Sequence, residues 1–150
     1  MSFFSLIPDI LPMILPTTVH VTKAAELEAQ RAGTDSPMIR QGAVVGKTDR
    51  MCATAKANCS SAVHHHAEQD TIIYAASGKG ILVTNPGNET EPKLKRQELT
   101  AGDFAFIPPW TEHQEINETD EDVVWILIRS GPEPTVVWLT DWGGDQAKAD

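Results

Sequence analysis

Four of the five histidines fall in two short windows, and this clustering is the clearest sign of chemistry in the sequence. His64, His65 and His66 are consecutive, and His113 follows a Pro-Pro turn further along the chain. Side chains alternate across a strand, so His64 and His66 would share one face and His65 would lie on the other. Two imidazoles in that relation can share a metal ion. A histidine triplet alone is also typical of a solvated turn, so the interpretation depends on its surroundings.

The surroundings are β-structure. From residue 39 onward, short runs rich in Val, Ile, Thr and aromatic residues alternate with Gly- and Pro-containing turns. Regularly spaced short strands of this kind predict an all-β sandwich or barrel. The predicted strands are 42–45, 51–57, 62–66, 71–76, 80–84, 94–99, 103–107, 113–117, 123–129 and 135–139.

The histidine windows lie in two blocks that resemble the paired motifs of the cupin superfamily. Seven residues match the spacing of those motifs: His64, His66 and Gly78 in the first, and Gly102, Pro108, His113 and Asn117 in the second. The segments HHHAEQDTIIY, GDFAFIPP and GPEPTVV are also similar to a group of small single-domain cupins. The motifs span about 61–117. The resemblance implies a double-stranded β-helix, or jelly roll, with one divalent metal in its mouth held by His64, His66 and His113.

Two positions depart from the family pattern. Trp110 replaces a glycine of the second motif, and Thr71 occupies the position of the glutamate ligand. A neutral hydroxyl is a poor ligand for a divalent ion. Asp70 can supply the carboxylate if the turn is one residue shorter, and Glu68 and Gln69 are within reach. The alternatives are three histidines completed by water, or a site without metal.

Other residues near the motifs are candidates for binding and catalysis. Glu115 and Asn117 can accept hydrogen bonds from the ring nitrogens that do not face the metal, although Glu115 can equally face solvent. Arg40 can hold an anionic substrate or form a surface ion pair. Apolar walls are needed to exclude water from a pocket, and four residues can supply them or belong to the core: Ile73, Phe106, Trp110 and Trp125.

These residues predict a metal-dependent enzyme acting on a small oxygenated organic molecule, such as a phenol, diketone or organic acid. Our first choice is a non-haem dioxygenase with iron, and Mn, Ni, Zn or Cu are the other metals considered. The alternatives are a non-oxidative decarboxylase, isomerase or cyclase, and a small-molecule-binding cupin without catalysis.

Charge and cysteine content restrict the partners and the compartment. The 150 residues include 12 Lys and Arg and 21 Asp and Glu, for a net charge of −9 without any basic run. Such a chain is a poor binder of nucleic acid or anionic membranes. Cys52 and Cys59 lack a CxxC spacing, so we predict free thiols and a cytoplasmic location.

The N-terminal residues 1–21 form an apolar arm ahead of a single cupin domain, residues 22–150. The run 3–16, FFSLIPDILPMILP, is too short and too proline-rich for a membrane helix, and no basic residue precedes it as in a signal peptide. We expect the arm to pack on its own domain or across a partner in a homodimer. A short helix is predicted over 22–32, capped by Thr22.

Overall fold

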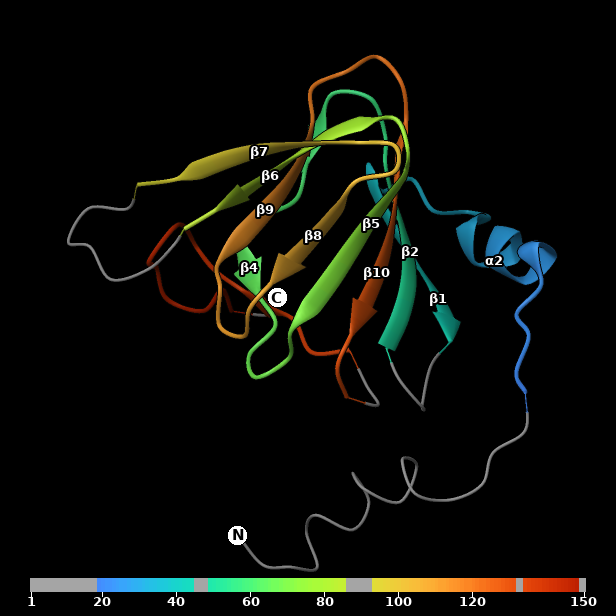
Figure 1. Ribbon diagram of the computed structural model, residues 1–150, viewed down its shortest axis with the longest axis horizontal. Coiled ribbons are helices and arrows are strands. Elements are labelled where there is room, and N and C mark those ends of the chain that lie inside the picture. The colour runs from blue at the N-terminus through green and yellow to red at the C-terminus, as the bar shows by residue number, and fades with distance from the viewer. Residues whose placement is uncertain (1–18, 45–48, 86–92, 132–133, 149–150) are drawn as a thin grey trace, which may run out of the picture.

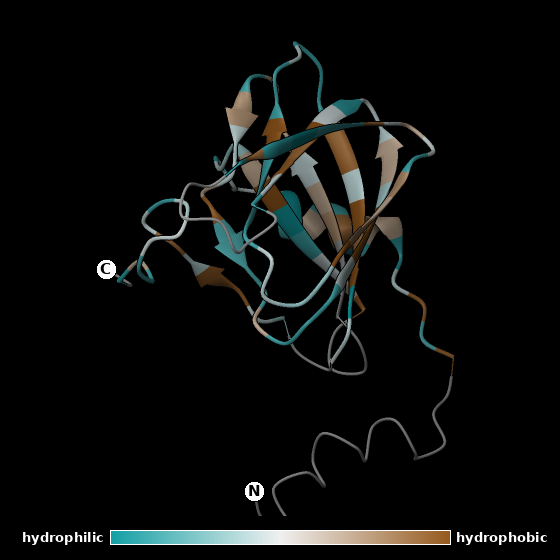
Figure 2. Ribbon diagram, turned by 60° about the vertical axis from the view of Figure 1, so that its left-hand side comes forward, coloured by the Kyte–Doolittle hydropathy of each residue, from teal (hydrophilic) through white to brown (hydrophobic). Residues whose placement is uncertain are grey.

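The fold consists of two antiparallel sheets packed face to face, with one short helix outside them (Figure 1). The computed structural model describes residues 19–44, 49–85, 93–131 and 134–148; the arm segment 3–16 lies outside these residues. Hydrophobic and hydrophilic residues intersperse along the strands (Figure 2), as expected when each strand has one face toward a core. The predicted all-β jelly roll is confirmed.

The first sheet has five strands in the order β1-β2-β10-β5-β8. All its neighbouring strands are antiparallel. Their bounds are Met38–Val44 for β1, Asp49–Ala55 for β2, Val123–Arg129 for β10, Thr71–Ser77 for β5 and Phe104–Ile107 for β8.

The second sheet has the order β11-β4-β9-β6-β7, and β3 also pairs with β9. This sheet carries the two histidine windows on neighbouring strands. Its strands are β11, Val137–Trp138; β4, His64–His65; β9, His113–Asn117; β6, Lys79–Thr84; β7, Lys95–Thr100; and β3, Cys59–Ser60.

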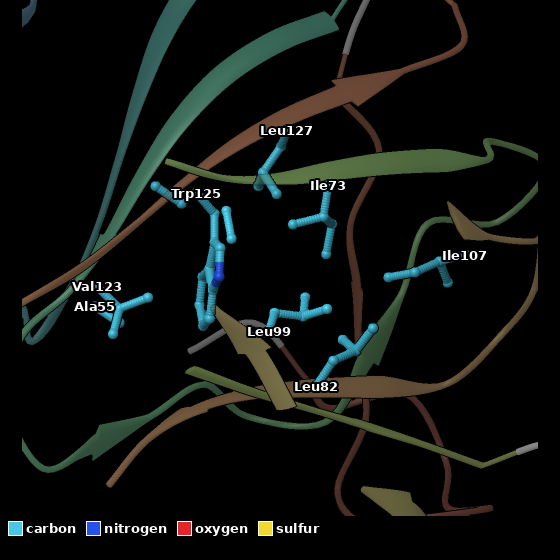
Figure 3. Packing of buried hydrophobic residues seen from close by; sticks show 10 residues of the cluster. Ala55, Ile73, Leu82, Leu99, Ile107, Val123, Trp125 and Leu127 are labelled. Carbon is cyan, nitrogen blue, oxygen red and sulfur yellow. The ribbon is translucent and has the colours of Figure 1, made fainter. Parts of the chain in front are cut away.

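The core lies between the sheets and is centred on Trp125. Burial alternates strictly along β10, so that Val123, Trp125 and Leu127 point inward (Figure 3). The indole packs directly on Gly80 of the opposite sheet: a Cβ placed there would lie 2.2 Å from Cζ2 of Trp125. Only glycine therefore fits beneath this ring, and the contact joins the two sheets.

The helix and some strands differ from the predicted ranges. Helix α2, Ala24–Arg31, begins at a Lys23 N-cap, whose amide donates to Oε1 of Glu26 at 3.0 Å. The predicted cap at Thr22 is wrong, because that hydroxyl donates to the carbonyl of Ala43 instead. The predicted strand 62–66 shortens to β4, and a turn in which the Gln69 amide donates to the His66 carbonyl follows it.

Two further expectations concern the thiols and the membrane. Cys52 and Cys59 are free, as predicted, but they are half-buried and not fully buried as a structural thiol would be. Among the described residues, no helix has the length and apolar character that a membrane crossing requires.

Candidate metal centre

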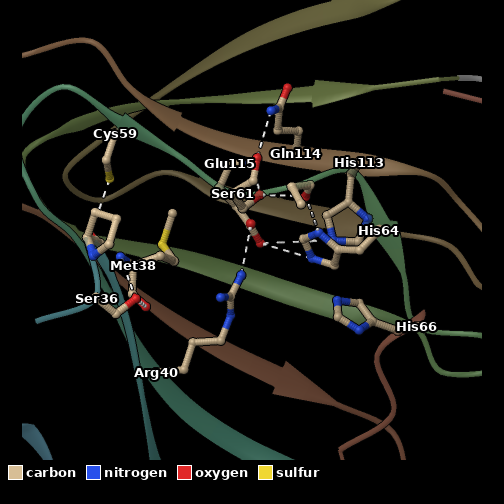
Figure 4. A network of polar contacts seen from close by, with 12 residues as sticks. Ser36, Met38, Arg40, Cys59, Ser61, His64, His66, His113, Gln114 and Glu115 are labelled. Carbon is tan, nitrogen blue, oxygen red and sulfur yellow. Dashed lines mark hydrogen bonds and ion pairs between the residues drawn. The ribbon is translucent and has the colours of Figure 1, made fainter. Parts of the chain in front are cut away.

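Three buried histidines from adjacent segments converge between the sheets (Figure 4). His64 on β4 is paired in register with His113 on β9, and His66 follows one residue after β4 ends. All three are at most 3% exposed, and their candidate ligand atoms lie within 4.8 Å of one another. The alternation predicted from the sequence thus places His64 and His66 on one side.

Backbone carbonyls determine which ring nitrogen of each histidine is free. Nδ1 of His64 lies 2.9 Å from the Ala62 carbonyl oxygen, and Nδ1 of His113 lies 2.9 Å from that of Thr111. Nδ1 of His66 lies 2.7 Å from the carbonyl oxygen of Thr135. Because a carbonyl only accepts, each Nδ1 carries the proton and each Nε2 presents a lone pair.

The three Nε2 atoms are buried and have no hydrogen-bond partner. A buried acceptor without a hydrogen-bond partner lowers the stability of the folded state. Three such acceptors that point to one place would add up to a large cost in folding free energy if nothing bound between them. A divalent metal satisfies all three lone pairs at once, so these residues fit the metal that the sequence predicts.

The pKa values of the histidines favour this state. Burial, chiefly, lowers the pKa of His113 to about 4 and that of His66 to about 2. The positive charge of Arg129 adds to the effect at His66. Burial also lowers the pKa of His64. The imidazoles are therefore neutral near pH 7, as metal ligands must be.

Glu115 places a carboxylate beside the histidines. It lies two residues after His113 on β9, so the two side chains share a face. Its Oε1 is 3.7 Å from Nε2 of His64 and 4.0 Å from Nε2 of His113. It does not belong to the group of ligand atoms that lie within 4.8 Å of one another. The carboxylate therefore lies next to the three lone pairs, on the side of His64 and His113.

Arg40 holds this carboxylate from the other side. Its Nη2 is 3.3 Å from Oε2 of Glu115, and its guanidinium lies 5.5 Å from the ring centre of Trp138. Burial opposes ionisation of Glu115, whereas the positive charge of Arg40 and a hydrogen bond from Ser61 stabilise the ionised carboxylate and lower its pKa. Arg40 is thus an interior partner of the site and not part of a surface ion pair.

The prediction that Glu115 and Asn117 accept the ring protons of the histidines is wrong. Backbone carbonyls take that role, and neither Glu115 nor Asn117 does. The Asn117 amide instead donates to the carbonyls of Ala55, Lys56 and Glu121 and so fixes the adjoining turns.

Thr71 occupies the position of the family's glutamate ligand, and its side chain points inward but carries no charge. Thr71 is 1% exposed and its Oγ1 has no hydrogen-bond partner. Across the sheet it pairs with Arg129, which is also buried. Sequence reasoning missed Arg129, although it follows the inward alternation of Trp125 and Leu127. Asp70 is half-buried and lies outside the histidine group, so its role as a ligand stays a prediction.

Of the four residues predicted to form the pocket walls, two are buried and two are exposed. Ile73 and Trp125 are buried in the core. Phe106 and Trp110 are 62% and 64% exposed. Phe106 lines a groove of about 700 Å³ between β6, β7 and β8, whose lining includes none of the three histidines.

Trp110 stands apart from the histidine group. Its ring centre lies 5.5 Å from that of His65, the histidine that is not part of the group. Its φ of 61° lies in the left-handed region, which explains why the family pattern has glycine here.

Comparison with known proteins agrees with this fold. Part of the sequence is 26% identical over 62 residues to a gentisate 1,2 dioxygenase from Aquipseudomonas alcaligenes, a match that covers 41% of this chain and 16% of that protein.

Solved structures show the same architecture. A Klebsiella pneumoniae protein with a double-stranded β-helix domain superposes with a TM-score of 0.62 at 14% identity, covering 88% of this chain and all of that one. An oxalate oxidase structure superposes with a TM-score of 0.63 at 14% identity, covering 71% of this chain and 57% of the oxidase chain. Bacillus subtilis oxalate decarboxylase superposes with a TM-score of 0.57 at 21% identity, covering 63% of this chain and 24% of the decarboxylase chain.

The chain spans less than two thirds of both the gentisate dioxygenase and the oxalate oxidase, so these likenesses describe the shared domain. The profile of the family described as Cupin domain matches residues 52–129, just over half of the chain, and includes all three histidines. The chain belongs to the cupin domain family.

Proposed function

We propose that this protein is a metal-dependent enzyme acting on a small oxygenated organic molecule, and that it is a non-haem dioxygenase. The observation that carries the proposal is the convergence of three buried Nε2 lone pairs, each fixed by a carbonyl on the opposite ring nitrogen. The similarity to a gentisate dioxygenase supports the oxidative choice.

His64, His66 and His113 would hold one divalent transition metal, with iron preferred. When bound, the metal supplies Lewis acidity toward a substrate oxygen and, as iron, the capacity to use O₂. Three protein ligands leave positions for a substrate carbonyl, hydroxyl or carboxylate. Thr71, in the place of a glutamate, adds no negative charge to compete with such an anionic group.

Glu115 and Arg40 would serve the substrate. The Oε1 atom of Glu115, beside the histidine nitrogens, is placed to accept a proton from a substrate hydroxyl. Arg40 keeps that carboxylate ionised and oriented through its contact with Oε2. The positive charges of Arg40 and the buried Arg129 favour a substrate that carries an anionic oxygen, such as a phenolate or an organic acid.

Glu115 also favours a second candidate function. A buried, ionised carboxylate can accept a proton from a substrate, and this proton transfer serves a non-oxidative decarboxylase, isomerase or cyclase that stabilises an enolate. This alternative uses the same metal site but needs no O₂.

Metal analysis combined with O₂ uptake over a panel of phenols, diketones and organic acids tests the proposal. We expect bound iron and substrate-dependent O₂ consumption that the Glu115→Gln variant largely loses while it still retains metal. Turnover without O₂ would replace the dioxygenase with the second candidate. Tight ligand binding without turnover would refute an enzymatic role.

A further inference from the structure

The histidine group is enclosed, so a metal ion or a substrate needs a way in. His64, His66 and His113 are at most 3% exposed, and the Nε2 atom of each is buried. A small molecule therefore reaches these nitrogens only if a neighbouring group moves. The contacts around the group indicate which side chain that is.

Two edge strands meet beside the histidines. In the described chain, β1 is an edge of the first sheet, and β11 is an edge of the second, next to β4. Trp138 on β11 is paired in register with His64, so the two side chains share a face, and their ring centres are 4.8 Å apart. Arg40 on β1 lies 5.5 Å from the centre of the Trp138 ring. The contact between Arg40 and Trp138 thus closes the gap between the two edge strands.

Trp138 touches both solvent and the histidine group. It is 38% exposed, whereas His64, against which it packs, is fully buried. The Arg40 side chain is 19% exposed, and Figure 4 shows it pointing toward the buried Glu115. On this side, a single layer of side chains separates solvent from His64 and from the carboxylate.

Other sides of the group are closed more firmly. The groove between β6, β7 and β8 is lined by Leu82 and Ile107, which are at most 3% exposed, so a path from there crosses packed core. Near His66, the Thr135 amide donates to Oε1 of the buried Gln69 at 2.9 Å, and the Thr135 carbonyl accepts from Nδ1 of His66. Passage at that end would break the hydrogen bonds that orient a ligand.

The Trp138 side opens at a smaller cost. Rotation of the indole leaves the backbone in place, where the Leu139 amide donates to the Val63 carbonyl and the Ala147 amide donates to the Trp138 carbonyl. The rotation loses only ring contacts, of which the one with Arg40 is a cation–π interaction at a partly exposed position. Exposed side chains also change rotamer much faster than strands separate.

We propose that Trp138 is the gate of the metal centre, and that its indole swings away from His64 and Arg40 to admit a metal ion or a small substrate between β1 and β11. Arg40 borders this opening, so the opening attracts anions, in agreement with the substrate class proposed above. The gate rests on the enclosed histidine group, which the proposed function also uses, but not on the reaction catalysed there.

The test measures how fast diethyl pyrocarbonate, a small reagent that acylates neutral imidazoles, modifies His64 and His113 in the metal-free protein at pH 7. Fragment-ion mass spectrometry locates the label, and the exposed His20 is the internal standard. Trp138→Ala and Trp138→Leu remove the indole, whereas Trp138→Phe keeps a ring that Arg40 can contact. Trp142→Ala, in the same segment, is the matched control.

We expect the modification of His64 and His113, relative to His20, to be at least about tenfold faster in Trp138→Ala and Trp138→Leu than in the parent. Trp138→Phe should lie between them, and Trp142→Ala should match the parent. The faster rate should be independent of urea below the unfolding transition, because the opening is local. Zn²⁺ uptake and its release to excess EDTA should accelerate together and leave the dissociation constant nearly unchanged, since a gate alters rates and not affinity.

Three results would overturn the gate. One is an unchanged rate at His64 and His113 in Trp138→Leu, which also decides the matter if Trp138→Ala does not fold. Another is a faster rate that rises steeply with urea, because global unfolding would then expose the histidines. The third is weaker Zn²⁺ binding at an unchanged uptake rate, because Trp138 would then only position His64. A protein that binds no metal would contradict the proposed function, while the modification rates would still decide the gate.

Discussion

Acidification should destabilise the metal-free protein, and His113 should account for a defined part of the loss. Its pKa falls from 6.5 to about 4 on folding, mainly because the ring is buried. Between these values the unfolded chain binds a proton that the folded chain does not. The free energy of unfolding therefore falls as the pH drops from about 6.5 toward about 4.

The size of the effect follows from the shift. One pKa unit corresponds to about 1.4 kcal/mol, so His113 alone costs about 2 kcal/mol by pH 5 and about 3 kcal/mol by pH 4. The lowered pKa values of His64 and His66 act in the same direction. The free energy of unfolding of a domain of this size is about 5–15 kcal/mol in total, so a loss of this size is easily measured.

Urea unfolding followed by tryptophan fluorescence at pH 7, 6 and 5 in EDTA provides the assay. The parent should lose stability over this range, and His113→Gln should lose about 2 kcal/mol less, whatever its stability at pH 7. His20→Gln, at an exposed histidine, is the matched control and should follow the parent. Equal pH dependence in His113→Gln and the parent would refute the reasoning, as would stability that rises on acidification.

Three substitutions test other parts of the structure. Gly80→Ala should cost about 1–3 kcal/mol in the free energy of unfolding, because the new Cβ would lie 2.2 Å from Trp125; an unchanged urea midpoint would contradict this packing. Trp110→Gly should be more stable than Trp110→Ala by about 1 kcal/mol, since only glycine adopts the left-handed backbone freely; the reverse order would contradict it. If Asp70 is a fourth ligand, calorimetry should show weaker metal binding in Asp70→Asn and not in Thr71→Ala, whereas equal, negligible effects would favour three histidines completed by water or substrate.

The histidine group was predictable because its geometry follows from local rules. Alternation within a strand puts His64 and His66 on one face, and the motif spacing brings His113 to the neighbouring strand. The same alternation relates Glu115 to His113 and Arg129 to Trp125, so the sequence already contained a signal for both inward positions.

Other features depend on long-range contacts that residue types do not reveal. The acceptors of the histidine Nδ1 protons are backbone carbonyls, which every residue possesses, so no side chain marks them. The start of α2 shifted because the Thr22 hydroxyl contacts Ala43 on a distant strand. Strand β8 comes to lie beside β5 only through the sheet order.

The most direct test of the metal centre is calorimetric titration of the EDTA-treated protein with Zn²⁺ or Fe²⁺ under anaerobic conditions. The parent and His65→Ala should each bind one equivalent, because His65 is not part of the group. His113→Ala should bind at least about 100-fold more weakly, since it removes one of three ligands. One-equivalent binding of equal affinity in His113→Ala, or none in the parent, would contradict a metal centre formed by His64, His66 and His113.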